Sequence, residues 1–197
     1  MRIDKNLLKN VVNSRPELDE ADWSGAVVFL CTDQGVFFIM RSLDMPTHKG
    51  QVGFFGGHKK VGETPLEVAG REFTEETGLP ISEIEYLGCL PLVRTSFGKA
   101  ILPIVCYYAG DPKKVLNNAV SNGEWSDLFT YPWKQLLEED SWSMGLTRGL
   151  TPHPVLFHTL RTPWLASKFS QQESYMLWGA TAWMVWEMVQ RINNKDQ

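Results

Sequence analysis

Three carboxylates crowd one short stretch of the sequence. Glu72, Glu75 and Glu76 all lie in the six residues from Arg71 to Glu76. On a helix, spacings of three and four residues place these acids on one face, where each like-charged pair costs roughly a few tenths of a kcal/mol. Helix stability therefore does not explain the cluster, whereas a hard divalent cation such as Mg²⁺ or Mn²⁺ prefers carboxylate oxygens. The alternative is a solvated helix face without a ligand.

Local signals predict that the three acids lie on a helix over about 65–77. Thr64 and Glu67 have the spacing of a capping box, and the helix would open on a proline, whose missing N–H costs nothing in the first turn. Gly78 and then Pro80 supply the stop. The acids would lie on the flank between core and solvent. The stripe expected to face the core consists of Leu66, Ala69, Gly70 and Phe73.

Apolar runs on both sides of this helix predict strands. A hairpin is expected before the helix, and further strands after it, at 25–32, 35–42, 84–93, 100–110 and 125–133. A long glycine-rich loop over 43–57 leads from the hairpin towards the helix. Strands interleaved with helices indicate an α/β or α+β layered domain with a mixed sheet.

Two further helices and one irregular stretch complete the prediction. A leading helix is expected over 4–13, inside an N-terminal helical extension over 1–22, and a short helix near 134–140. The segment 141–163 is rich in proline and glycine, and we expect an irregular insert there. The apolar stretch Tyr175–Val189 is expected to be a buried helix, with its tryptophans at 178, 183 and 186 in the core.

Composition limits the class of protein. At 197 residues and 43% hydrophobic content, we expect one domain over 1–197 and no second full domain. The net charge of -4 argues against a nucleic-acid binder, which usually carries a basic excess. The cysteines are odd in number and far apart, which favours reduced core thiols in a cytoplasmic protein, at Cys31, Cys89 and Cys106.

No stretch of the sequence is typical of targeting or of a membrane span. The first ten residues lack the apolar core of a signal peptide. The late apolar stretch 175–189 is shorter than the ~20 residues that a spanning helix needs, and it contains Glu187. We therefore expect a small-molecule ligand, with no nucleic acid and no membrane as partner, and a homodimer remains open.

The acidic helix is part of a longer motif. Gly57, Glu63 and the run from Arg71 to Leu79 match the Nudix hydrolase signature at all nine of its defined positions, over residues 57–79. The chain is thereby identified as resembling this family. The resemblance implies an α/β/α sandwich with a mixed central sheet. It also implies hydrolysis of a diphosphate linkage with Mg²⁺ or Mn²⁺, in which the ion neutralises the phosphate oxygens and activates water.

The resemblance also assigns roles to residues. In similar proteins the carbonyl near Gly57 and the acids matching Glu72 and Glu76 hold the ion. Glu75 would be a further ligand or the base that takes a proton from water. The loop acid Glu124 in NNAVSNGEW resembles a second candidate base. Arg71 would pair with a glutamate, either Glu63 or Glu75, and keep the carboxylates in place.

Residues before the signature suggest the substrate. The run RSLDMPTHKGQVGFFGGH resembles the coenzyme A pyrophosphatase branch of the family at Arg41-Ser42, His48, Gly50-Gln51-Val52, Phe54 and Gly56-Gly57. Pro46 stands where the branch has a second arginine, and Phe55 where it has proline. The groups expected to meet ligand phosphates are Arg41, His48, Lys49, Lys59 and the loop glycines Gly56 and Gly57. Trp125 and Phe97 are candidates for stacking on adenine.

Three functions follow from these features. The first is hydrolysis of coenzyme A or an acyl-coenzyme A to 3′,5′-ADP and 4′-phosphopantetheine. The second is a Nudix hydrolase acting on ADP-ribose, dinucleotides or nucleoside triphosphates. The third is a ligand-sensing Nudix domain without catalysis, which is disfavoured because every acid of the signature is present.

Overall fold

The computed structural model describes residues 1–14, 22–95, 98–146, 154–161, 165–166 and 174–195. Its helices are α1 (Lys5–Val11), α2 (Pro65–Thr77), α3 (Pro112–Asn118), α4 (Trp133–Leu136) and α5 (Gly179–Asn193), with short 3-10 turns η1 (Ile81–Glu83) and η2 (Glu139–Ser141). The strands of the large sheet are β1 (Gly25–Cys31), β2 (Gly35–Arg41), β3 (Val52–Gly53), β4 (Phe55–His58), β5 (Glu85–Cys89), β6 (Val93–Arg94), β7 (Ala100–Tyr107), β8 (Trp125–Pro132) and β11 (Leu165–Ala166). A smaller sheet contains β9 (Trp142–Leu146), β10 (Pro154–Arg161) and β12 (Ser174–Trp178).

The large sheet is mixed, as expected. Its main path runs β11-β8-β2-β1-β7-β5, with β3 beside β2, β4 beside β1 and β6 beside β7. The pair β1 and β7 is parallel, whereas β1 is antiparallel to both β2 and β4. A parallel pair needs a long crossover, and here the crossover contains α2.

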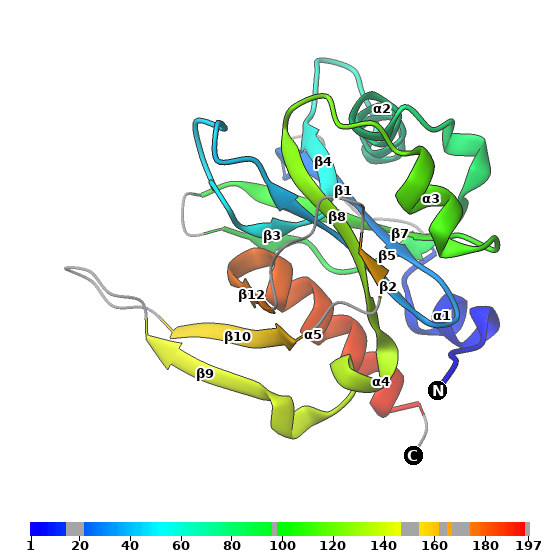
Figure 1. The fold of residues 1–197 in the computed structure, drawn as a ribbon, viewed down its shortest axis with the longest axis vertical. Helices are drawn as coiled ribbons and strands as arrows, with labels where there is room; N and C mark the ends of the chain where they lie inside the picture. The colour runs from blue at the N-terminus through cyan, green and yellow to red at the C-terminus, as the bar shows by residue number, and fades with distance from the viewer. Residues whose placement is uncertain (15–21, 96–97, 147–153, 162–164, 167–173, 196–197) are drawn as a thin grey trace.

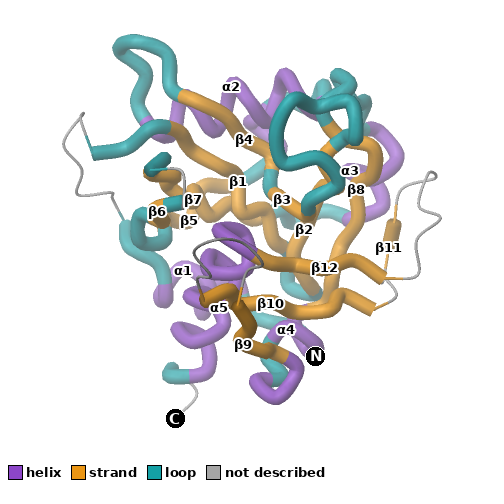
Figure 2. Tube along the Cα trace, turned by 90° about the vertical axis from the view of Figure 1, so that its left-hand side faces the viewer, coloured by secondary structure: helices purple, strands orange, loops and turns teal. Residues whose placement is uncertain are grey.

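Helices cover both faces of the large sheet, so the expected α/β/α sandwich is confirmed (Figure 1). Strand residues alternate between two cores because successive side chains point to opposite faces. Val28 and Leu30 of β1 pack with α2 and α3, whereas Phe29 between them packs with α1 and α5. Figure 2 shows α2 on one side of the strands and α5 on the other.

The predicted irregular structure over 141–163 was wrong for the residues of this segment that the structure describes. Residues 142–146 and 154–161 form β9 and β10, and β10 also pairs with β12. The prolines and glycines of this segment suggested irregular structure. The strands form because they pair with segments far apart in the sequence, and local composition does not report such pairing. The described part of the chain contains no helix long and apolar enough to cross a membrane.

The late helix begins later than expected. Residues 174–178 form β12, and α5 begins at Gly179, whose φ of 66° breaks the strand. Trp178 and Trp183 are 38% and 40% exposed, so their predicted place in the core was wrong, whereas Trp186 packs against the core beside Trp142. The predicted loop 43–57 contains β3 and most of β4. Helix α3 was not predicted, although Asp111 supplies its N-cap and Pro112 its first-turn proline.

Candidate active site

Helix α2 has the bounds that its caps predict. The Thr64 side chain accepts from the Glu67 amide and the Glu67 carboxylate accepts from the Thr64 amide, which is the predicted capping box. Gly78 ends the helix in the left-handed region at φ 71°. The helix packs on β1 and β4, and the Phe73 ring meets Phe55 of β4 edge-on.

The buried face of α2 differs from the predicted stripe. Leu66 is 47% exposed, whereas Val68, Phe73 and Glu76 are fully buried. The predicted margin position is therefore wrong for Glu76, whose side chain accepts a hydrogen bond from Gly56 of β4 and whose main-chain carbonyl accepts one from Trp125 of β8. The other two acids remain accessible: the side chain of Glu72 is 14% exposed and that of Glu75 is 51% exposed.

Glu76 is a buried carboxylate with one free oxygen. Its Oε2 accepts the Gly56 amide over 2.7 Å. Its Oε1 is buried and has no hydrogen-bond partner among the described residues. Burial raises the pKa of Glu76 to about 8. The negative charges of Glu124 and Glu72 add to this rise, whereas the hydrogen bond from the Gly56 amide and the positive charge of Arg41 oppose it. Burial of an acid oxygen that has neither a hydrogen-bond donor nor a bound cation is energetically unfavourable.

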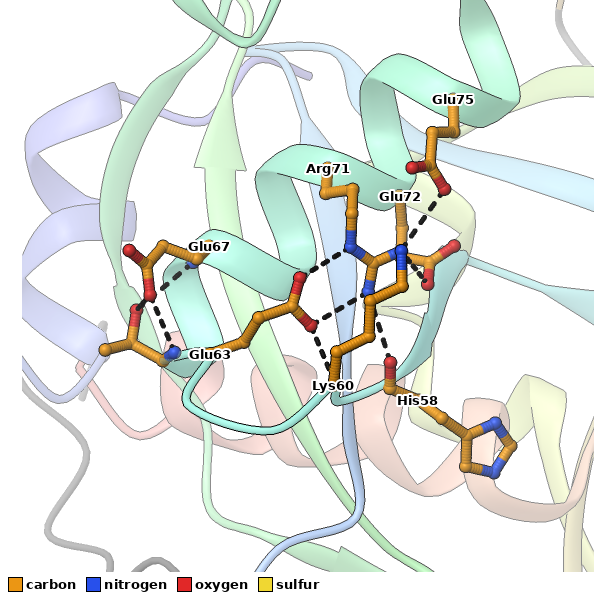
Figure 3. A network of polar contacts seen from close by, with 8 residues as sticks. His58, Lys60, Glu63, Glu67, Arg71, Glu72 and Glu75 are labelled. Atoms are coloured by element: carbon orange, nitrogen blue, oxygen red, sulfur yellow. Dashed lines mark hydrogen bonds and ion pairs between the residues drawn. The ribbon is translucent and has the colours of Figure 1, made fainter.

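Arg71 gathers the other glutamates of the signature (Figure 3). Its Nε and Nη2 donate to the two oxygens of Glu63 over 2.6 and 3.0 Å, as a bidentate pair. Its Nη1 donates to Glu72 over 2.7 Å and to Glu75 over 3.2 Å. The arginine holds the pKa of Glu63 at about 2. Arg71 therefore pairs with Glu63, with Glu75 and with Glu72, so both expected partners are found.

The glycines before α2 allow the main chain to approach these acids. A Cβ on Gly57 would lie 2.2 Å from Oε1 of Glu72, so only glycine leaves room for that carboxylate. Gly56 has φ 150°, and a Cβ there would lie 2.4 Å from the Ala26 carbonyl of β1. Glycine at both positions therefore lets β4 lie against β1 on one side and Glu72 on the other.

Two residues distant in sequence join this site. Glu124 precedes β8, and its carboxylate lies 4.0 Å from the Nη2 of Arg41 at the end of β2. Both side chains act electrostatically on Glu76. Their exposed fractions are 41% for Glu124 and 19% for Arg41. The fold thus brings together the predicted base candidate and one predicted phosphate-binding residue.

The remaining candidates lie in different settings. His48 and Lys49 are exposed in the loop after β2, where the His48 Nδ1 lies 3.1 Å from Gln51 Oε1. Lys59 places its ammonium 4.7 Å from the centre of the Trp23 ring, a cation–π contact. Trp125 is 6% exposed and therefore offers no open ring for adenine, so that prediction was wrong. Phe97 lies outside the described residues.

Trp125 nevertheless contacts the site in a role that sequence reasoning did not predict. Its indole N–H donates to the main-chain carbonyl of Glu76 over 2.8 Å. A signal existed in the sequence, because Pro80 lies four residues after Glu76 and has no N–H to offer that carbonyl. The sequence did not show which donor would replace it.

The donor set suits a hard divalent cation. The unsatisfied oxygen of Glu76 and the Glu72 carboxylate against Gly57 supply the oxygen ligands that such an ion prefers. Within the described ranges, however, no three His, Cys, Asp or Glu side chains already form a group that could hold a metal ion. Arg71 donates to both Glu72 and Glu75 in this arrangement. For one ion to bind all three acids, Glu72 and Glu75 would have to replace their contacts to Arg71 with contacts to the ion.

Comparisons with known proteins agree with the motif. The sequence model of the NUDIX domain matches residues 22–147. An Escherichia coli protein described as "Uncharacterized Nudix hydrolase NudL" is 31% identical over 163 residues, covering 82% of this chain and 77% of the relative. The protein with the same description from Escherichia fergusonii has the same identity and coverage. Among solved structures, a MutT/nudix family protein from Enterococcus faecalis has a TM-score of 0.48 at 16% identity and covers 91% of this chain and 66% of its own.

Proposed function

This chain belongs to the Nudix hydrolase family, and we propose that it hydrolyses the diphosphate linkage of coenzyme A or an acyl-coenzyme A with Mg²⁺ or Mn²⁺. The products would be 3′,5′-ADP and 4′-phosphopantetheine. The observation that carries the proposal is the buried carboxyl group of Glu76, which has one oxygen without a hydrogen-bond partner among the described residues and interacts electrostatically with Glu124, Glu72 and Arg41. Such an oxygen is costly without a cation.

The residues of the chain would divide the work. Glu72, Glu75, Glu76 and the Gly57 carbonyl would hold the ion, which when bound neutralises diphosphate oxygens and lowers the pKa of a bound water. The bidentate pair with Glu63 fixes Arg71, whose Nη1 in turn donates to Glu72 and Glu75. These contacts orient the acids before substrate arrives.

Two carboxylates are candidates for the base that receives the proton. Glu75 and Glu124 have side chains 51% and 41% exposed, so both carboxylates are accessible from solvent. Glu75 is held by Arg71 at 3.2 Å, and Glu124 lies 4.0 Å from Arg41. Replacing each by glutamine separates them: the base variant should lose kcat and the acidic limb of the pH–rate profile, whereas the other variant should keep that limb.

The basic residues support a substrate with several phosphates. Arg41 lies beside Glu124. Its Nε is buried without a hydrogen-bond partner among the described residues. His48 and Lys49 follow in the exposed loop after it. Coenzyme A carries a 3′-phosphate in addition to its diphosphate, which gives such cations a second anion to bind. Phe55, which replaces the proline of the coenzyme A branch, packs on Phe73, so this departure serves the core and leaves the glycine pair in place.

A substrate panel tests the proposal. Purified protein with Mg²⁺ or Mn²⁺ is incubated with coenzyme A, ADP-ribose, NADH, diadenosine polyphosphates and dNTPs, and products are identified by mass spectrometry. We expect 3′,5′-ADP from coenzyme A, no reaction in EDTA, and no reaction by Glu76→Gln prepared in parallel. Turnover of another compound in the panel without 3′,5′-ADP release would refute the coenzyme A assignment. Ligand binding without any turnover would instead support a sensing domain.

A further inference from the structure

The last turn of α2 contains a backbone group that its own segment cannot satisfy. Carbonyls near a helix end lack intrahelical donors, and the Glu76 carbonyl cannot take one from Pro80. The Trp125 indole donates to this carbonyl over 2.8 Å. The Val120 amide donates to the carbonyl of the next residue, Thr77, over 2.9 Å. The segment that ends in Trp125 therefore caps the C-terminal end of the acidic helix.

A β-bulge puts Trp125 on the α2 face of the sheet. Neighbouring residues of β2 pair with Trp125 and Asp127, so Ser126 is an extra residue in β8. In a regular strand, residues 125 and 127 would share one face. Instead Asp127 accepts a hydrogen bond from Tyr175, which packs in the α5 core, while Trp125 packs in the α2 core. Without the bulge the indole could not reach Glu76.

The capping segment also carries Glu124. The Glu124 amide donates to the Asn122 side chain over 3.0 Å, and its carbonyl accepts the Ser42 amide over 2.8 Å. The adjacent Trp125 carbonyl accepts the Ser121 hydroxyl over 2.6 Å. Glu124 is therefore held on both sides by its backbone, one residue from the indole that binds the helix end.

We propose that Trp125 is a positioning residue, which sets the carboxylates of Glu76 and Glu124 relative to each other by capping the last turn of α2. The proposal rests on the proposed hydrolase function for its catalytic consequence. Its structural part stands on the two hydrogen bonds at the helix end and on the bulge. Because the Glu76 carbonyl and its side chain belong to one residue, loss of the cap would allow the carboxylate to move away from the Gly56 amide.

The chain offers a matched control. Trp133 is also a buried tryptophan, and its indole N–H donates to the Thr32 carbonyl over the same 2.8 Å. It lies in the α5 core, on the other face of the sheet from α2. Trp125→Phe and Trp133→Phe each remove one indole donor and leave an aromatic ring, so a merely structural role predicts similar effects of both changes.

Three measurements separate positioning from stability. NMR hydrogen exchange of the Val120 and Gly56 amides should become at least about tenfold faster in Trp125→Phe and stay unchanged in Trp133→Phe. Mn²⁺ affinity, measured from free Mn²⁺ by EPR, should weaken about tenfold in Trp125→Phe alone. Its kcat should fall about tenfold while KM stays within about twofold. Denaturant unfolding should show comparable losses of stability in the two variants.

The outcomes are distinguishable. Unchanged exchange at both amides in Trp125→Phe, or equal changes in both variants, would overturn the positioning role. If the wild type neither binds Mn²⁺ nor hydrolyses any compound of the panel, the proposed function fails, and the exchange comparison still decides whether Trp125 holds the helix end. Should Trp125→Phe fail to fold, benzothienylalanine at position 125 removes the N–H while it keeps the shape of the ring, and the same measurements apply.

Discussion

Glu76→Gln should make the metal-free protein less sensitive to pH. Burial raises the pKa of Glu76 from 4.5 to about 8 in the folded state. The folded state therefore holds a proton that the unfolded chain releases, and stability is full below the lower value and is lost as pH rises towards the higher one. At about 1.4 kcal/mol per pH unit, the loss reaches about 3 kcal/mol by about pH 7 and about 5 kcal/mol above about pH 8. Glutamine does not ionise, so the variant should escape this loss.

The assay is urea unfolding of both proteins in EDTA at several values of pH. The difference in unfolding free energy, variant minus wild type, should rise by about 3 kcal/mol between about pH 4.5 and about pH 7. The pH dependence is the readout, because the buried amide of glutamine adds an offset that does not vary with pH. Val61→Ala, which changes no titratable group and lies at an exposed position, is the control and should give a flat difference.

Two results would refute this reasoning. A flat difference over the same range would mean that Glu76 does not titrate in a buried environment. A difference that falls with pH would mean that a cation already compensates the carboxylate in the metal-free protein. Added Mg²⁺ or Mn²⁺ should stabilise the wild type more than the variant, since ligand binding to the folded state raises its stability by mass action.

Two further substitutions and one labelling experiment test other parts of the structure. Gly57→Ala should displace the Glu72 carboxylate, because the added Cβ would lie 2.2 Å from its oxygen, and should lower kcat by roughly a hundredfold. The control is Gly53→Ala, where an added Cβ has nothing within 4 Å, and this variant should retain activity in the same assay. Arg71→Lys should lower kcat by roughly tenfold or more because lysine cannot form the bidentate pair with Glu63; a variant with wild-type kcat would show that the pair does not position the acids. None of the three cysteine thiols should react with DTNB before unfolding, since all are buried, and a fast reaction in native buffer would contradict that burial.

Sequence reasoning located α2 because its signals are local. The capping box of Thr64 and Glu67 and the stop at Gly78 involve residues that are neighbours in the chain, and the structure confirms both. The Nudix signature was found for the same reason. The pairing of Arg71 with Glu63 was also predictable, since the helix and the preceding loop bring them together over eight residues.

The burial of Glu76 was not predictable in this way. Residues 69, 73 and 76 share one helical stripe, but a glutamate is expected to be outside a core. Its burial depends on β4 and on Trp125, forty-nine residues away, which the bulge at Ser126 turns towards the helix. A bulge has no local composition signal, so the contact appears only when β2 and β8 are paired.

The late position of α5 in the chain has a consequence for folding during synthesis. This helix is translated after every strand it covers, and it supplies Met184, Val185, Met188 and Val189 to the core on its face of the large sheet. Until the ribosome releases these residues, Phe29 and Phe38 lack the cover that α5 provides, and an exposed apolar sheet face invites association with other nascent chains. A chaperone that shields this face would be needed most before α5 has emerged.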